Sequence, residues 1–267
     1  MKHLYLILIC VLLVSCKQGR EEPKQEPDET SCPCCKVLTQ DESTCGGELA
    51  WDYPVKPGTE EWNELSSTQQ REDTCQIPEN ILSSLSTEDL TKICLQYPFL
   101  YSFIFAQNCR DSGFEVLLYE FNGIRELYQR DDVSKELLKQ YRCAIQNLSA
   151  LDSDSPDFGV IINISILDCL LSWYYSENND AQENYREILL NLLCGYEKEL
   201  MYPEYFGYIG NLVKTNYFAR MHLIINICPQ CFGFQEGYRP FLCGNEFSKE
   251  TADKINELSY QLLNIEP

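Results

Sequence analysis

The sequence predicts an all-α protein, in which helical hairpins stack on one another behind an extended, cysteine-rich N-terminal arm. Three observations predict this fold class. Apolar residues recur at the three- and four-residue spacing of helices from about residue 59 onward. Helices with one polar face alternate with helices that are apolar on nearly every side, and the linkers are rich in Asp, Ser, Asn and Gly. In a stack, inner helices are covered on both sides and outer ones on one, which produces this alternation.

The amphipathic helices, which have one apolar and one polar face, are recognised by their apolar stripes and capping residues. Stripes predict helices at residues 86–97, 114–128 (interrupted at Asn122-Gly123), 133–148, 185–193 and 248–262. Ser86 and Asp89 have the spacing of a capping box, Asp131 or Asp132 is expected to cap the helix that follows, and Ser248 to cap the last one.

Two segments are apolar on nearly every side, and both are expected to be inner helices. The first covers residues 158–175 and is interrupted by Asn163, Asp168 and Ser172. Residues 160–166 alone would also suit a strand, but the total length favours a buried helix. Asp168 would be costly in lipid, so the segment is not expected to span a membrane. The second covers residues 205–227. No repeat of fixed period is evident, so the stack is expected to be HEAT-like in style or an irregular bundle.

The N-terminal arm, residues 32–75, is expected to be irregular because it is rich in Cys, Pro and Gly. Trp51, Tyr53 and Trp62 are predicted to pack it against the helical domain of residues 76–267. The alternative is that these aromatic side chains form an exposed platform for a sugar or a peptide.

The first sixteen residues carry an export signal. Lys2 precedes an apolar run over residues 4–14, which is too short for a membrane span but suits the apolar region of a signal peptide. The run ends in Leu13-Val14-Ser15-Cys16, which resembles the lipobox of bacterial lipoproteins. The resemblance implies that residues 1–15 are removed and that Cys16 carries a covalent lipid, including palmitate. It also implies that the protein is held at a bacterial membrane, at the outer membrane or the cell surface.

The segment after Cys16 suits a tether. Residues 17–31 contain no aliphatic or aromatic side chain and are dense in Glu, Pro, Lys and Gln, a composition typical of disorder. As a coil, such a segment spans roughly 20 Å. A globular body would therefore stand just clear of the lipid headgroups.

Charge excludes one class of partner. The chain holds 41 Asp and Glu against 21 Lys and Arg, a net charge of −20. Phosphate backbones and anionic lipid surfaces are repelled by such a body, so neither nucleic-acid binding nor charge-driven membrane contact is expected.

Several catalytic classes lack their residues. His222 is the only histidine outside the signal peptide, and its place in an apolar helix is typical of a structural side chain. The sequence contains no glycine-rich phosphate loop, no HExxH and no GxSxG motif. A hydrolase that uses two carboxylates stays open as an alternative, because acidic residues are abundant.

The cysteines divide into two groups. Removing Cys10 and Cys16 from the fifteen leaves thirteen. Four of them stand in helical stripes and are expected to be mostly reduced core residues: Cys94, Cys143, Cys169 and Cys194. Cys109 belongs to neither group. The disulfide candidates stand in the arm and in loops: Cys32, Cys34, Cys35, Cys45, Cys75, Cys228, Cys231 and Cys243.

Two paired motifs, Cys32-Pro-Cys34-Cys35 and Cys228-Pro-Gln-Cys231, allow three interpretations. The favoured one is disulfides, at least one of which joins residues 32–75 to the rest of the chain, for example near residues 228–243. The second is a zinc ion held by Cys32, Cys35, Cys228 and Cys231. The third is a redox dithiol, because CPxC resembles the motif of thioredoxin-like proteins, although Cys228 ends a helix instead of beginning one.

Taken together, these features predict a membrane-tethered helical binding or scaffold module without catalytic activity, whose partner is a protein or a glycan. A thiol-redox or zinc protein of the envelope and a carboxylate-dependent hydrolase are the alternatives.

Overall fold

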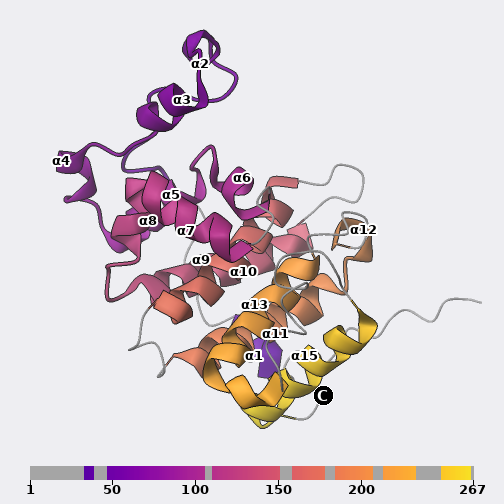
Figure 1. The fold of residues 1–267 in the computed structure, drawn as a ribbon. Coiled ribbons are helices and arrows are strands. Elements are labelled where there is room, and N and C mark those ends of the chain that lie inside the picture. The colour runs from indigo at the N-terminus through magenta and orange to yellow at the C-terminus, as the bar shows by residue number, and fades with distance from the viewer. Residues whose placement is uncertain are drawn as a thin grey trace, which may run out of the picture.

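The structure, a computed structural model, describes residues 33–38, 47–105, 110–150, 158–177, 184–206, 213–232 and 248–265. Every regular element in these ranges is helical, so the predicted all-α class is confirmed (Figure 1). The signal peptide, Cys16 and the tether lie outside the described residues. The helices of the N-terminal half are α1 (Pro33–Leu38), α2 (Glu60–Glu64), α3 (Thr68–Thr74), α4 (Glu79–Leu82), α5 (Thr87–Leu95), α6 (Leu100–Phe105), α7 (Arg110–Glu120), α8 (Asn122–Leu127), α9 (Val133–Asn147) and the 3-10 turn η1 (Leu148–Ala150). Those of the C-terminal half are α10 (Phe158–Glu177), α11 (Tyr185–Glu199), α12 (Pro203–Phe206), α13 (Val213–Ile227), the 3-10 turn η3 (Pro229–Phe232) and α15 (Lys249–Leu263).

The two helices predicted to be apolar all round form the centre of the stack. α10 packs between α9 and α13, and α13 also contacts α11 and α15. Residues 160–166 lie within α10, so the strand alternative for them was wrong. Residues 164–173 of the same helix are all buried. The inner and outer roles of the helices therefore follow the predicted alternation. The predicted helix over residues 205–227 is α12 followed by α13, with residues 207–212 outside the described part.

None of the helices described here combines the length and the apolar character needed to cross a membrane.

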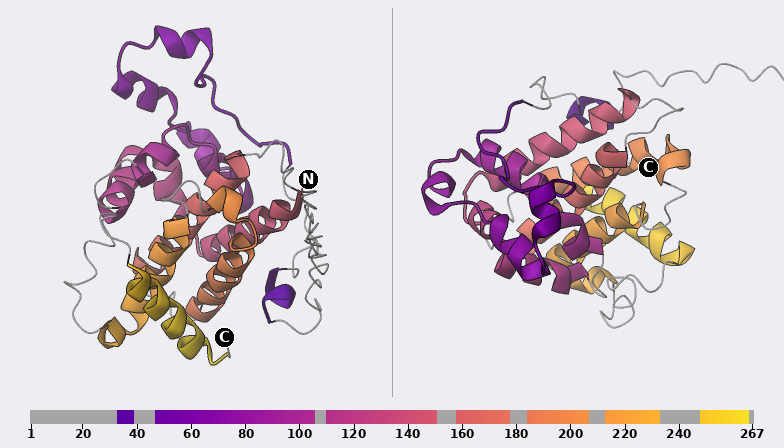
Figure 2. Two further views of the ribbon diagram at one scale, coloured as in Figure 1. Left: turned by 90° about the vertical axis from the view of Figure 1, so that its right-hand side faces the viewer. Right: turned by 90° about the horizontal axis from the view of Figure 1, so that it is seen from above.

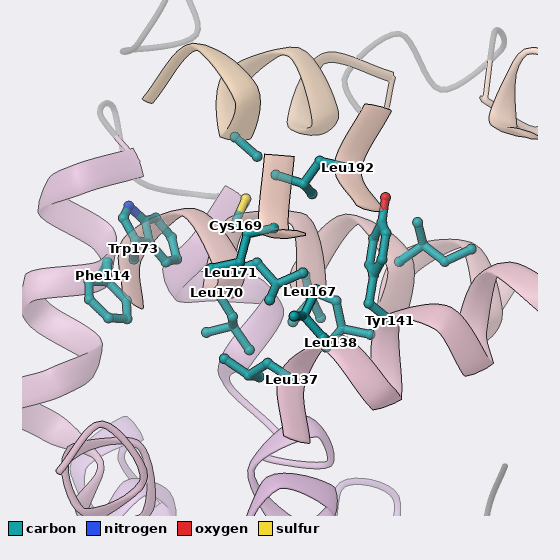
Figure 3. Close-up of a cluster of buried hydrophobic side chains, with 14 of the residues drawn as sticks. Phe114, Leu137, Leu138, Tyr141, Leu167, Cys169, Leu170, Leu171, Trp173 and Leu192 are labelled. Carbon is teal, nitrogen blue, oxygen red and sulfur yellow. The ribbon is translucent and has the colours of Figure 1, made fainter. Parts of the chain in front are cut away.

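A continuous hydrophobic core joins the two halves of the chain. Phe114 of α7 stacks on Trp173 of α10 with 4.3 Å between ring centroids. Beside this pair, leucines of α9 and α10, including Leu137 and Leu170, fill the space between the two helices (Figure 3). Stacked rings add to the stabilisation that comes from burial alone.

Capping residues set the helix starts at two of the three predicted places. Ser86 Oγ accepts the backbone N–H of Asp89 at 3.1 Å, and Ser248 Oγ accepts that of Thr251 at 3.1 Å. Asp132 stands at the N-cap position of α9, but its side chain caps nothing. Its carboxylate instead accepts the Thr87 hydroxyl at 2.6 Å, so a tertiary contact replaces the predicted cap.

The break between α7 and α8 falls at Phe121, directly before the predicted interruption at Asn122-Gly123, and Asn122 holds the segment that follows the arm. Asn122 accepts the N–H of Ile77 at 3.0 Å and donates to its carbonyl at 2.7 Å. At Gly123 a Cβ would lie 2.4 Å from the Phe121 ring and 2.9 Å from Ile77 Cδ1, so a larger residue does not fit.

The arm is more regular than predicted, because α1, α2 and α3 lie within residues 32–75. Thr59 and Ser67 cap α2 and α3, and these local hydrogen bonds support helices that have no apolar stripe. The pair α2 and α3 projects from the end of the molecule opposite α1 (Figures 1 and 2).

The arm's aromatic residues pack as predicted. Tyr53 is 4% exposed, and its hydroxyl donates to the carbonyl of Ile93 at 3.0 Å. The ring of Trp51 meets Tyr53 edge-on at 4.9 Å, and Trp62 packs on Phe99 at 5.6 Å. These rings hold the arm to the body and do not form an open platform.

Candidate functional site

A disulfide fastens the N-terminal arm to the helical body. It joins Cys34 of α1 to Cys194 of α11, 160 residues apart. α1 lies against α11 and α9, so Cys34 meets the buried face of α11 directly. The disulfide expected between residues 32–75 and the rest of the chain is present, and its partner is Cys194 on the buried face of α11 and not a cysteine near residues 228–243.

The division of the remaining cysteines needs correction. Cys143 of α9 is also disulfide-bonded, so Cys143 and Cys194 are not the reduced core residues that were predicted. Cys94 and Cys169 are buried thiols, as predicted. Cys75 was a disulfide candidate but is a buried thiol with an exposed fraction of 0%, because the end of α3 turns it into the core. Cys32, Cys45, Cys109, Cys243 and the side chain of Cys35 lie outside the described part.

Cys228 and Cys231 form a disulfide with each other just after α13. The N–H of Cys231 donates to the carbonyl of Cys228 at 2.9 Å, within the turn η3. Sulfurs joined in this way are not thiolates, and zinc requires thiolates. The negative end of the α13 dipole also disfavours a thiolate here, which suits a stable disulfide better than a redox dithiol.

His222 has the structural role expected of it. Its Nδ1 lies 3.3 Å from the carbonyl oxygen of Ser172, and its ring stacks on Phe218 with 5.8 Å between centroids.

Two carboxyl groups do converge, but inside the protein. Asp168 of α10 and Glu199 of α11 are 0% and 1% exposed and interact electrostatically with each other. Asp168 accepts the Thr215 hydroxyl at 3.0 Å and the Asn216 amide at 3.2 Å. Neither carboxyl reaches solvent in this conformation, so neither can act on a substrate.

Arg220 of α13 is the counter-charge of this pair, and it is fully buried. Its guanidinium lies 4.4 Å from the ring centroid of Tyr196 and 4.9 Å from that of Tyr217. Nε donates to Asn216 at 2.8 Å, and Nη1 donates to Asn256 at 2.9 Å. Aromatic faces and amide oxygens replace the water that a charge loses on burial.

Among the described residues, Arg220 is the positive charge that acts on both carboxyl groups, and one positive charge beside two buried carboxyls favours a proton on one of them. Burial raises the pKa of Asp168, to about 7, and raises that of Glu199 well above its ordinary range. Both oxygens of Glu199 lack a hydrogen-bond partner within the described residues, whereas Asp168 accepts hydrogen bonds from Thr215, Asn216 and Tyr141. Hydrogen bonds favour the ionised form of Asp168, which places the proton on Glu199.

A cavity of about 290 Å³ opens beside the Cys34–Cys194 disulfide. Its lining comes from α1, α9, α11 and the end of α15: Val37, Arg142, Arg186, Glu187, Leu190, Asn191, Leu263 and Ile265. The Arg142 side chain is 9% exposed, whereas Arg186 and Glu187 are exposed residues, so the cavity opens to solvent on their side.

Hydrogen bonds hold both arginines in place. Arg142 Nη2 donates to Glu187 Oε1 at 2.7 Å, and its Nε donates to Asn191 Oδ1 at 2.9 Å. Arg186 Nη2 donates to the carbonyl of Leu263 at 2.8 Å. The sequence does not reveal this cavity, since its lining residues come from four helices and share no motif.

No family model, curated protein or solved structure matches the chain.

Proposed function

We propose that the protein is an exported, lipid-anchored helical binding module without catalytic activity. Cys16 carries the lipid, residues 17–31 form the tether, and the helical body is held at a bacterial outer membrane or cell surface. Its partner is a protein, a glycan or a smaller ligand. The lipobox supports the anchor, and the open cavity supports binding.

The observation that carries the proposal furthest is the Cys34–Cys194 disulfide. Disulfides form and persist in oxidising compartments, which suits an exported protein. Cys34 also comes soon after the tether in the chain and is bonded to the buried face of α11. A tether that ends there would be fastened to the rigid core of the body.

Two further observations favour binding over catalysis. The convergent carboxyls of Asp168 and Glu199 are buried, and His222 already contacts a backbone carbonyl. The cavity, by contrast, opens to solvent and is lined by both apolar and charged side chains, as ligand sites commonly are.

The lipid anchor is tested by labelling cells with a palmitate analogue. Wild-type protein is expected to take up the label and to sediment with membranes, because the lipobox resemblance makes Cys16 the acylated residue. Cys16→Ser should abolish the label. Cys10→Ser removes a cysteine from the same signal segment and should leave labelling intact. Undiminished labelling of Cys16→Ser would overturn the proposal.

A further inference from the structure

We propose that the cavity between α1, α9, α11 and the end of α15 binds a small amphipathic anion, namely a carboxylate with an aliphatic chain of medium length. This inference rests on the proposed binding function and names its ligand, but it does not depend on the lipid anchor.

The charges that line the cavity favour one negative charge on the ligand. Arg142 and Arg186 carry two positive charges, and Glu187 carries one negative charge. Arg142 is already paired with Glu187, so Arg186, which donates to a backbone carbonyl, supplies the positive charge that a ligand would meet, in a chain whose net charge is −20. Salt screens distant charges beyond about 8 Å at physiological ionic strength, so the local arginines outweigh the acidic surface for a ligand inside the cavity.

A carboxylate suits these donors better than other anions. Guanidinium groups present planar, paired N–H donors that match the two oxygens of a carboxylate. Arg186 is the arginine that can receive the ligand, because Arg142 already donates to Glu187 and Asn191, and the bond from Arg186 Nη2 to the Leu263 carbonyl limits the conformational freedom lost on binding.

The apolar part of the lining favours an aliphatic chain. Apolar side chains come from three helices, α1, α11 and α15, and from the segment just after α15. They are Val37, Leu190, Leu263 and Ile265. A volume of about 290 Å³ lies at the lower limit of ligand pockets, which range over roughly 300–1,000 Å³, so the cavity suits a small ligand. Octanoate is of that size, whereas a whole phospholipid is far larger.

The test is isothermal titration calorimetry of the purified, oxidised full chain with octanoate. Binding with one site per chain is expected. Octylamine would bring a like charge to the arginines and 1-octanol lacks the charge, so both should bind at least about tenfold more weakly, the size of effect that a charged hydrogen bond produces. Inorganic phosphate has no apolar chain and should bind more weakly as well.

Two matched variants separate the cavity from overall charge. Arg186→Gln should weaken octanoate binding about tenfold, because it removes one charged donor from an exposed position without disturbing the core. Arg125→Gln is the control, since Arg125 is also exposed and also donates to a backbone carbonyl, that of Tyr119 at 3.3 Å, but lies on α8 outside the cavity. The Arg125→Gln variant should bind octanoate with the affinity of the wild type.

Several outcomes would overturn the inference: no octanoate binding at millimolar concentration, equal binding of octanoate and 1-octanol, phosphate binding as tight as octanoate, or equal weakening by both variants. Each leaves the palmitate labelling of Cys16 unaffected. Conversely, persistent labelling of Cys16→Ser would remove the anchor and leave the cavity result standing.

Discussion

The Cys34–Cys194 disulfide should be a major source of stability, and its removal is a quantitative test of how the arm is held. The bond closes a loop of 160 residues. For a loop of that length, the chain-entropy model gives about 5 kcal/mol at room temperature, and natural disulfides typically contribute about 2–5 kcal/mol. The double variant Cys34→Ala with Cys194→Ala should therefore lose at least about 2 kcal/mol of unfolding free energy.

The assay is urea unfolding followed by far-ultraviolet circular dichroism, which also checks that the native protein is predominantly helical. Cys94→Ala is the matched control, because Cys94 is a fully buried thiol and its replacement leaves only a small cavity. If the double variant unfolds at the same urea concentration as Cys94→Ala, the disulfide does not stabilise the folded protein by holding the arm.

Three further predictions concern the interior. The pKa of Glu199 is raised in the folded protein, so the contribution of Glu199 to the free energy of unfolding is complete at low pH. This contribution is lost as the pH rises above 4.5, the ordinary pKa of a glutamate, because the unfolded chain ionises first. Glu199→Gln should remove this loss, so urea midpoints measured at about pH 5 and about pH 8 should differ less for the variant than for the wild type; an unchanged difference would mean that Glu199 is ionised in the fold. Gly195→Ala would place a Cβ 2.0 Å from the Tyr141 hydroxyl, and a loss of about 1–3 kcal/mol is expected from chemical denaturation; a wild-type midpoint would show that Tyr141 moves aside freely. Cys75, whose pKa burial raises to about 11, and Cys94 should react with iodoacetamide only after denaturation, and rapid labelling of the native protein, followed by mass spectrometry, would contradict their burial.

The features that the sequence predicted well are those that local interactions determine. Ser86 and Ser248 cap their helices because a cap needs only residues within one turn. Asp132 has the same local signal, but a hydroxyl 45 residues away takes its carboxylate. The N-cap position was predicted correctly, but the capping hydrogen bond does not form, because Thr87 of another helix binds the carboxylate and helical spacing does not show which helices become neighbours.

Cysteine pairing depends on the same long-range information. Cys94 and Cys194 both stand in apolar stripes, yet one is a buried thiol and the other is bonded to α1. Helical spacing tells which face of a helix a cysteine occupies and not what lies opposite that face. The short helix α1 carries no stripe of its own, so its position against α11 could not be predicted.

The buried charges are a case in which the sequence held a usable signal. Asp168 stands in one nearly all-apolar helix and Arg220 in the other, and their charges are opposite. An unpaired buried charge costs several kcal/mol, so two inner helices that each bury one charge must bring those charges into one network. Asp168 was treated only as an interruption of an apolar run. Pairing it with Arg220 would have predicted that α10 and α13 are neighbours, the packing observed at the centre of the stack. The burial of Glu199 could not be predicted in this way, because a glutamate at the end of an amphipathic helix is usually solvated. Its burial follows from the position of α11 against α13, and a buried glutamate that lies near another carboxyl is favoured in its protonated form.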